Sequence, residues 1–198
     1  IRVYDMEELC DVAKALANQP PSRGGKVAII TNGGGCGVMA ADQAELLGLE
    51  VTRFEDETCR ELEKLKKQGV LPDIVTVSNP LDLTGSATDE SFVESLEVIL
   101  RDKRVDAVVM VALHHPPGIT EKLPDKLLKV VREYRKPIVA CDVGGAEMAR
   151  RFRHSFDKAG VPAYPTPERA CKALKALVSY GTYLLKHGAL NEHLERGY

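Results

Sequence analysis

The sequence predicts an α/β fold, with a mostly parallel, doubly wound sheet and helices on both of its faces. Short apolar, β-branched runs alternate along the chain with segments whose apolar residues recur at helical spacing, and the connections between them are short. This alternation is typical of parallel strands joined by crossover helices. The most hydrophobic run, Val105–Leu113, is predicted as a central strand, because a strand covered on both faces is apolar along its whole length.

The stretch Lys26–Asp42 predicts the first strand, turn and helix of this sheet. Lys26–Thr31 is a short β-branched run, four glycines crowd the turn that follows, and helix formers continue from Val38 to Leu47. A helix that begins without bulky side chains presents free backbone N–H groups and the positive end of its dipole. We therefore interpret the turn as a binding site for a phosphate or carboxylate, in preference to a close helix–strand contact alone. The predicted phosphate-binding residues are Asn32, Gly33, Gly34, Gly35, Cys36 and Gly37, and the apolar residues at helical spacing are Val38, Ala41, Ala44 and Leu47.

The spacing of these glycines excludes two common nucleotide-binding motifs. The dinucleotide fingerprint G-x-G-x-x-G, counted from Gly34, would need a glycine where Met39 stands. No Lys-Ser or Lys-Thr pair follows the glycines, which excludes a P-loop. The turn therefore belongs to neither of these motif classes.

The rest of the chain continues the alternation of strands and helices. The expected strands are Glu50–Phe54, Pro137–Cys141 and Val161–Tyr164, and Val70–Leu83 is expected to be extended and broken by proline. The expected helices are Asp56–Lys67, one capped by Thr88 that ends near Leu100, Thr120–Tyr134, Gly144–Ala159, and one that begins at Thr166-Pro167.

Three loops that follow predicted strands carry glycines or polar side chains. They are Thr31–Gly37, Ala112–Gly118 and Asp142–Gly145. Ligands of open α/β sheets bind at the edge where the carboxyl ends of the strands meet. The three loops are therefore expected to form one site.

Composition limits the class of protein. The chain has 198 residues, of which 44% are apolar and 28% charged, so we expect a globular domain with an ordinary core. A net charge of −2 with both signs interspersed argues against nucleic acid as a partner, and the longest apolar run, Ala107–Leu113, is too short to span a membrane. Five cysteines without C-x-x-C spacing predict reduced thiols in a cytoplasmic protein, with no disulfide and no metal site.

Three segments are expected along the chain. Residues 1–25 are predicted to be a linker, because the amphipathic, N-capped helix Asp5–Asn18 is followed by the Pro- and Gly-rich stretch Gln19–Gly25, and to come from a domain upstream. The α/β domain is expected over 26–186, and the polar tail 187–198 is expected to be loose. The predicted apolar stripe of the first helix comprises Leu9, Val12, Ala13 and Leu16.

Three motifs together resemble those of the NDP-forming acyl-CoA synthetases. They are T-N-G-G-G-C-G-V-M-A-A-D at Thr31–Asp42, N-P-L-D-L-T-G at Asn79–Gly85 and V-D-A-V-V at Val105–Val109. The chain from Asp5 to about Tyr180 resembles the last flavodoxin-like domain of the α part of ADP-forming acetyl-CoA synthetases, and is similar to the C-terminal domain of the succinyl-CoA synthetase β subunit. The resemblance implies a flavodoxin-like three-layer sandwich.

The resemblance also implies a function shared with other domains. In this family an acid, CoA and ATP give acyl-CoA, ADP and phosphate through a phosphohistidine, and the helix after Gly33–Gly37 would hold that phosphoryl group. The phosphorylated histidine lies in a Ser-His-Thr-Gly context that this sequence lacks, so no catalytic residue and no bound cofactor are expected in this chain alone. CoA, ATP or ADP, and Mg are expected in the whole enzyme, which is expected to be an oligomer. The implied partners are upstream CoA-binding and flavodoxin-like domains, an ATP-grasp subunit or fused domain, and a small carboxylic acid or acyl-CoA.

The polar residues near the same edge remain open to several interpretations. His114 and His115 are candidates for an acyl pocket, for a second phosphoryl acceptor, for metal ligands, or for an ordinary polar loop. Adjacent side chains on an extended segment point in opposite directions, so at most one of the two is expected to enter the site. Asn79 and Asp82 are further acyl-pocket candidates, which alternatively orient the glycine loop or merely cap turns, and Asp142 has a similar status. Cys36 is interpreted as a small filler, although a helix N-terminus can lower the pKa of a thiol.

A second hypothesis assigns the same fold to a protein that does not catalyse the ligase reaction. The chain would then be a non-catalytic metabolite-sensing or scaffold domain, as in fused protein acetyltransferases. An upstream Ser-His-Thr-Gly segment and an ATP-grasp partner would favour the enzyme.

Overall fold

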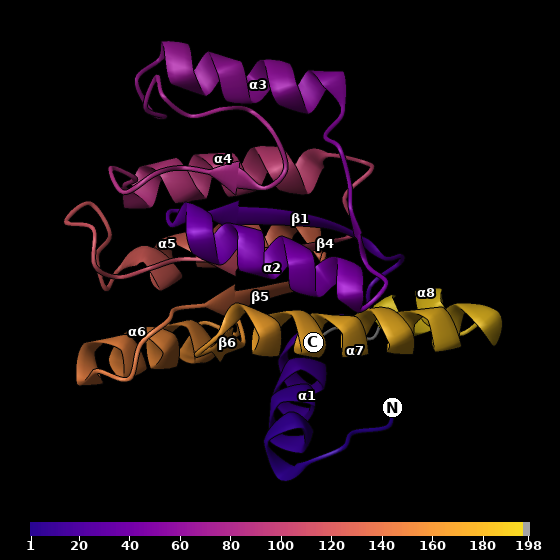
Figure 1. Cartoon of the computed structure of the whole chain (residues 1–198). Coiled ribbons are helices and arrows are strands. Elements are labelled where there is room, and N and C mark those ends of the chain that lie inside the picture. Colours follow the sequence, from indigo (N-terminus) through magenta and orange to yellow (C-terminus); the bar gives the residue numbers. More distant parts are fainter. Residues whose placement is uncertain (196–198) are drawn as a thin grey trace.

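A six-stranded parallel sheet forms the centre of the computed structural model, which describes residues 1–195 (Figure 1). The strands are β1 (Lys26–Thr31), β2 (Glu50–Val51), β3 (Leu81–Asp82), β4 (Ala107–Val111), β5 (Ile138–Cys141) and β6 (Ala163–Tyr164). Their order is β2-β1-β4-β5-β6, and β3 pairs with the end of β1 beyond β2. The fully buried strand β4 lies between β1 and β5, so the predicted central strand is confirmed.

Helices cover both faces of the sheet. They are α1 (Met6–Asn18), α2 (Gly34–Leu46), α3 (Asp56–Lys67), α4 (Asp89–Arg101), α5 (Leu123–Tyr134), α6 (Glu147–Lys158), α7 (Pro167–Lys186) and α8 (Leu190–Glu195). Alternate residues of β1 point to opposite faces: Ala28 and Ile30 pack in the cluster that includes α3 to α6, whereas Val27 and Ile29 pack with α1, α2 and α7. The predicted three-layer α/β fold is therefore confirmed. None of the helices in residues 1–195 is both long and apolar enough to cross a membrane.

The helix after the glycine turn differs from its prediction in start and orientation. It begins at Gly34, so most of the glycines lie in its first turn. Its buried residues are Gly37, Ala40 and Ala44, whereas Val38 is 57% exposed. Of the four residues at helical spacing, Ala44 is buried, Ala41 and Leu47 pack half-buried against the core, and Val38 lies outside, because small residues bring the backbone of α2 close to the sheet.

Residues 1–25 pack against the domain. Arg169 on α7 donates to both carboxylate oxygens of Asp11, at 2.6 and 2.8 Å, and Tyr164 Oη donates to the Asp11 carbonyl. The Gln19 side chain accepts from the Ile138 N–H (2.7 Å) and donates to the Gly160 carbonyl (2.6 Å). The segment that resembles a linker is thus ordered by polar contacts, and its connection to an upstream domain stays a prediction. The buried residues of α1 are Asp11, Val12 and Ala15, and Leu16 packs half-buried against the core, so the predicted stripe is correct at Val12 and Leu16 and wrong at Leu9 and Ala13, which are exposed.

The chain after α7 is more ordered than expected. Residues Leu190–Glu195 form α8, with Leu190 buried, and Arg23 donates to Asn191. The expectation of a loose tail is therefore wrong for this part. The last three residues of that prediction, 196–198, lie outside the described residues.

The Asn79 side chain lies beside β1, in the gap between the short strands β2 and β3. Its Oδ1 accepts from the Ile29 N–H (2.8 Å), and its Nδ2 donates to the carbonyls of Val27 (2.8 Å) and Thr52 (2.7 Å). These contacts fill the gap beside β1 between β2 and β3. Asn79 therefore serves the sheet and is not a candidate for contact with a ligand.

We predict that Asn79→Ala destabilises the fold by about 1–3 kcal/mol, because buried backbone groups of β1 lose their partner. The free energy of unfolding by urea measures the change. Ser78→Ala is the matched control, since its exposed hydroxyl makes one 3.3 Å bond to the Pro80 carbonyl. Equal stability of the two variants would contradict this role for Asn79.

Candidate functional site at the carboxyl edge of the sheet

The loops after β1 and β4 are fastened together by one buried amide. Asn32 Nδ2 donates to the Leu113 carbonyl (2.9 Å), and the Leu113 N–H donates to Asn32 Oδ1 (2.8 Å). Asn32 is 3% exposed. The side chain predicted as a phosphate ligand is thus occupied by the neighbouring loop, which it holds against the start of α2.

The loop after β5 is joined to the same place by an acid–histidine pair. His114 Nδ1 lies 2.7 Å from Asp142 Oδ2, and both side chains are buried. Arg153 on α6 donates to the carbonyls of Asp142 (2.6 Å) and Gly144 (3.1 Å). The three loops predicted to meet at this edge therefore do meet, through side-chain hydrogen bonds.

The first turn of α2 is open at this edge. Its N-cap, Gly33, makes no side-chain cap, and no acidic residue lies in the first turn. Among the described residues, the N–H groups of Gly34, Gly35 and Cys36 have no hydrogen-bond partner. They are the donors that an anion at a helix N-terminus uses.

Close packing accounts for three of the four glycines in this turn but not for the fourth. A Cβ atom would lie 2.5 Å from Leu113 Cδ1 at Gly33, 2.6 Å from Asp82 Oδ2 at Gly34, and 2.7 Å from Thr31 Cγ2 at Gly37. These three glycines permit close packing. A Cβ at Gly35 would have nothing within 4 Å, and Gly35 has no positive φ. Packing within this chain therefore does not explain the absence of a side chain at Gly35.

The other predicted residues take up distinct positions. Asp82 is half-buried, lies against Gly34 and accepts from the Thr84 N–H (2.9 Å). The rings of His114 and His115 lie side by side, with centroids 4.0 Å apart, so the expectation that they point in opposite directions was wrong. The loop leaves the strand at Val111, and the alternation of an extended segment does not continue through it.

Cys36 does not have the properties of an activated thiol. Burial raises its pKa, and the carboxylates of Glu168 and Asp142 raise it further. These effects give no support to a reactive thiol, and the interpretation of Cys36 as a small filler stays a prediction. Burial likewise raises the pKa of Asp142, although the charge and hydrogen bonds of His114 oppose the shift. Within residues 1–195, no cluster of three His, Cys, Asp or Glu side chains could hold a metal ion.

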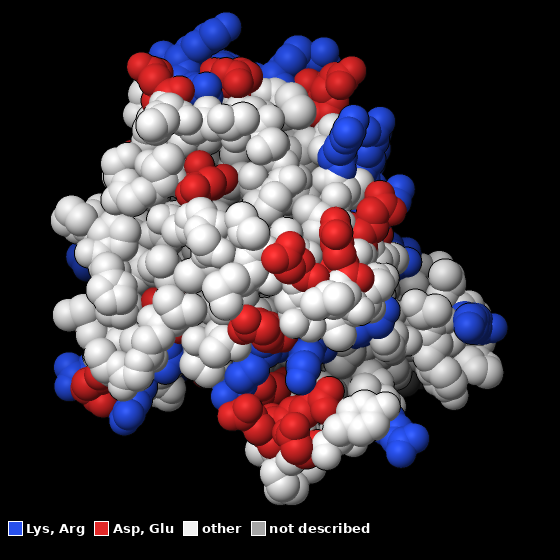
Figure 2. Space-filling model, in the orientation of Figure 1, with Lys and Arg blue, Asp and Glu red and all other residues white. Residues whose placement is uncertain are grey.

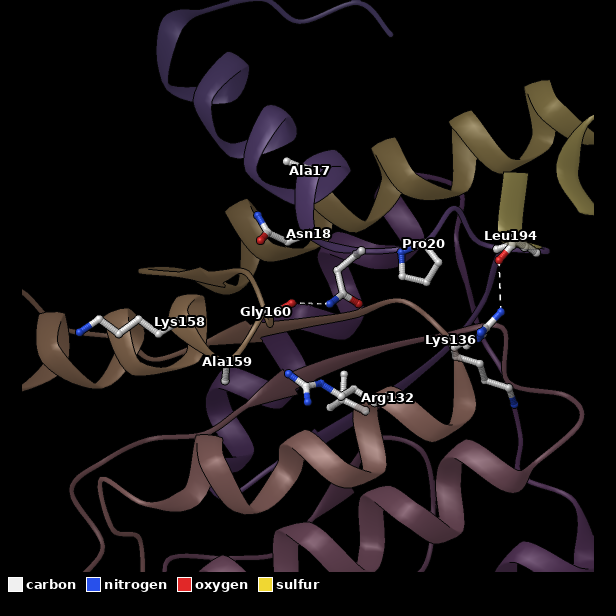
Figure 3. A pocket seen from close by; sticks show the side chains of 12 residues that line it. Ala17, Asn18, Pro20, Arg132, Lys136, Lys158, Ala159, Gly160 and Leu194 are labelled. Atoms are coloured by element: carbon white, nitrogen blue, oxygen red, sulfur yellow. Dashed lines mark hydrogen bonds between the residues drawn. The ribbon is translucent and has the colours of Figure 1, made fainter. Parts of the chain in front are cut away.

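A pocket of about 460 Å³ lies at the opposite edge of the sheet (Figure 3). Its basic side chains stand at helix C-terminal ends, where cations complement the helix dipole. Arg135 donates to the Leu194 carbonyl and Lys136 to that of Asp102, while Lys158 points away from the other labelled residues in Figure 3. We interpret these residues as stabilising helix ends.

Asp89 fixes the far end of the His114 loop, a role with no signal in the sequence beyond its place after the Thr88 cap. Asp89 accepts from the Thr120 N–H (2.8 Å), from Thr120 Oγ1 (2.6 Å) and from Lys126 Nζ (2.7 Å). Burial favours the neutral carboxyl, but the bonds from Lys126 and Thr120 outweigh it and lower the pKa of Asp89. The loop is therefore held at both ends.

We predict that Asp89→Asn costs about 1–3 kcal/mol of stability at neutral pH. The pKa of Asp89 is lowered by folding, so its contribution is complete above the ordinary carboxyl pKa of about 4 and is lost as the pH falls through the lowered value. The difference in unfolding free energy between wild type and variant should therefore shrink below about pH 4. Glu90→Gln, an exposed neighbour in the same turn, is the control; a pH-independent difference would contradict the prediction.

The fold and this edge define a doubly wound α/β domain of the kind that places ligands at the carboxyl ends of its strands. The chain belongs to the Ligase-CoA domain family, whose profile matches residues 27–181. The predicted family resemblance is thus confirmed.

Named relatives of this chain are ADP-forming ligases. The chain is 37% identical to acetate–CoA ligase [ADP-forming] I subunit alpha of Pyrococcus furiosus, over 94% of this chain and 39% of that subunit. It is 34% identical to acetate–CoA ligase [ADP-forming] of Methanocaldococcus jannaschii, over 98% of this chain and 27% of that protein. The chain therefore spans about two fifths or less of the length of these relatives.

A solved structure has the same fold. It is the dinucleotide-forming acetyl-coenzyme A synthetase 1 of Ca. Korarchaeum cryptofilum in complex with phosphate and ADP. The TM-score is 0.80 and the identity 28%, over 93% of this chain and 40% of that one.

Proposed function

We propose that this chain is a domain of an ADP-forming acyl-CoA synthetase, which converts an acid, CoA and ATP into acyl-CoA, ADP and phosphate. Its membership of the Ligase-CoA domain family and the names of its relatives support this assignment. CoA and ATP or ADP are then substrates of the assembled enzyme, and the partners of this chain are the remaining domains or subunits. The relatives are ligases, which favours the enzyme over the non-catalytic sensor or scaffold.

The role proposed for this domain is to hold a phosphoryl group at the N-terminus of α2. The observation that carries it is Gly35, which is bare although this chain neither clashes with a side chain there nor requires positive φ. Its N–H and those of Gly34 and Cys36 have no partner among the described residues. Backbone donors fixed in advance stabilise a transferring phosphoryl group without reorganisation.

The surface around the start of α2 supports a partner at this edge. Val38 and Met39 are 57% and 48% exposed, although both are apolar. The strands end on the left of the molecule in Figure 1, and Figure 2 shows few charged side chains on that side at the height of α2. Exposed apolar patches mark protein contacts, so we assign this surface to the upstream flavodoxin-like domain.

The loop after β4 is proposed to handle the acyl end of the substrate. His114 and His115 stand beside Leu113, which packs against Gly33 at the start of α2. Asp82 lies on the other side of that start. A small acid or its acyl phosphate would therefore meet these three side chains next to the proposed phosphoryl site.

We predict that Gly35→Val reduces turnover of the assembled ligase by about 10²–10³ for each backbone donor that the side chain shields. The folded domain should be unaffected, because the position faces open space. Gly35→Ala separates the two effects further: alanine favours helix by up to about 1 kcal/mol, so this variant should melt no lower than wild type while turning over more slowly.

Turnover per folded molecule and melting temperature are measured on the same preparations. Glu45→Val, on the exposed side of the last turn of α2, controls for a β-branched residue in this helix. Unchanged turnover per folded Gly35→Val molecule would remove the proposed role of α2.

A further inference from the structure

His114 and Asp142 form a dyad at the carboxyl edge. The 2.7 Å contact joins His114 Nδ1 to Asp142 Oδ2, and the His114 N–H also approaches Asp142 Oδ1 at 3.4 Å. The side chains are 7% and 1% exposed. At neutral pH the ionised carboxylate accepts from Nδ1–H, which fixes both the ring and its tautomer.

The dyad leaves the second ring nitrogen of His114 available. Nε2 has no hydrogen-bond partner among the described residues. Within residues 1–195, the only side-chain nitrogen or oxygen that is fully buried without a partner is Ser95 Oγ, so Nε2 is not fully buried. Nε2 therefore reaches the surface. Because Nδ1 carries the proton, Nε2 carries the lone pair.

The imidazole is held on several sides. The His115 ring lies 4.0 Å from it and the buried Phe152 ring 6.2 Å from it, measured between centroids. Asn32 clamps the preceding residue, Leu113, and Arg153 binds the carbonyl of Asp142. A ring with one nitrogen bound to a buried carboxylate and the other directed outward has the arrangement of an activated nucleophile or base.

We propose that His114 Nε2 accepts a phosphoryl group from an acyl phosphate. The Nε2 lone pair forms the N–P bond, the bond between phosphorus and the acyl oxygen breaks, and the carboxylate leaves with its electron pair. The Nδ1 proton stays in its hydrogen bond to Asp142, whose negative charge offsets the positive charge that the ring gains. This goes beyond the proposed function, which places a phosphohistidine in another domain; only the choice of an acyl phosphate as donor rests on it.

The competing interpretation is that the pair only ties the loops after β4 and β5. In that case the reactivity of each histidine should follow its exposure. His115 provides the comparison within the same loop, because it is exposed and has no carboxylate partner among the described residues. The dyad therefore predicts modification of the less exposed of two adjacent histidines.

The experiment incubates the 198-residue chain with acetyl phosphate and, separately, with potassium phosphoramidate, which transfers a phosphoryl group and releases ammonia. Mass spectrometry of the intact chain measures the phosphoryl added, and peptide mapping under alkaline conditions locates it. We expect an acid-labile phosphoryl group on Nε2 of His114. His114→Gln should abolish it, and His115→Gln should leave it in place.

Asp142→Asn tests the positioning residue. Asparagine can donate to Nδ1 and move the ring proton to Nε2, so the initial rate should fall at least about 10-fold. The proposal would be overturned by any of three results on the wild-type chain. His114 is not modified, His115 is modified more than His114, or the modification is distributed over the histidines according to their exposure. These outcomes are read on the wild-type chain and so stand even if Asp142→Asn does not fold. They are independent of the Gly35 experiment, which measures turnover of the assembled ligase.

Discussion

The close approach of α2 to the end of β1 is the constraint on which the carboxyl edge depends. It requires bare backbone at Gly33, Gly34 and Gly37, which lie against Leu113, Asp82 and Thr31. A side chain at any of these positions would displace the Leu113, Asp82 or Thr31 side chain that now packs there. Because α2 lies so close, its first N–H groups reach the same edge as the loops after β4 and β5.

Buried hydrogen bonds then convert this proximity into a fixed arrangement. Asn32 joins the first loop to the second, the His114–Asp142 pair joins the second to the third, and Asp89 holds the far end of the second. The Asn32, Asp89 and Asp142 side chains are buried, where an unpaired polar group is costly. The surface beside them is different in kind: Gly35, Val38 and Met39 are exposed and make no such contacts. The edge is therefore rigid in itself and open toward a partner, which suits a site completed by another domain.

Much of the fold follows from local sequence patterns. The strand Lys26–Thr31 and the helix Asp56–Lys67 have their predicted bounds, because β-branched runs and charged amphipathic segments specify their own periods. The meeting of three loops was also predictable, since parallel strands end at one edge. The predictions failed where distant residues decide the outcome. Gln19 lies in a Pro- and Gly-rich stretch that resembles a linker, but its amide bonds residues of β5 and of the loop after α6.

In the site, too, local features were predictable and contacts between distant residues were not. The glycine turn was recognisable as a helix start, but the reason for each glycine was not, because Leu113, Asp82 and Thr31 are neighbours only in space. Asn79 looked like a site residue and instead bonds the backbone of β1 and of Thr52, just after β2. The pairing of His114 with Asp142 had no local signal, since the two residues are separated by a whole helix and strand.

We propose above that the start of α2 binds a phosphoryl group contributed by another domain. The most direct measurement is a structure of the assembled ligase in its phosphorylated state. We expect phosphoryl oxygens about 2.7–3.2 Å from the backbone nitrogens of Gly34, Gly35 or Cys36. A phosphoryl group bound elsewhere, with these nitrogens facing solvent or covered by protein side chains, would contradict it.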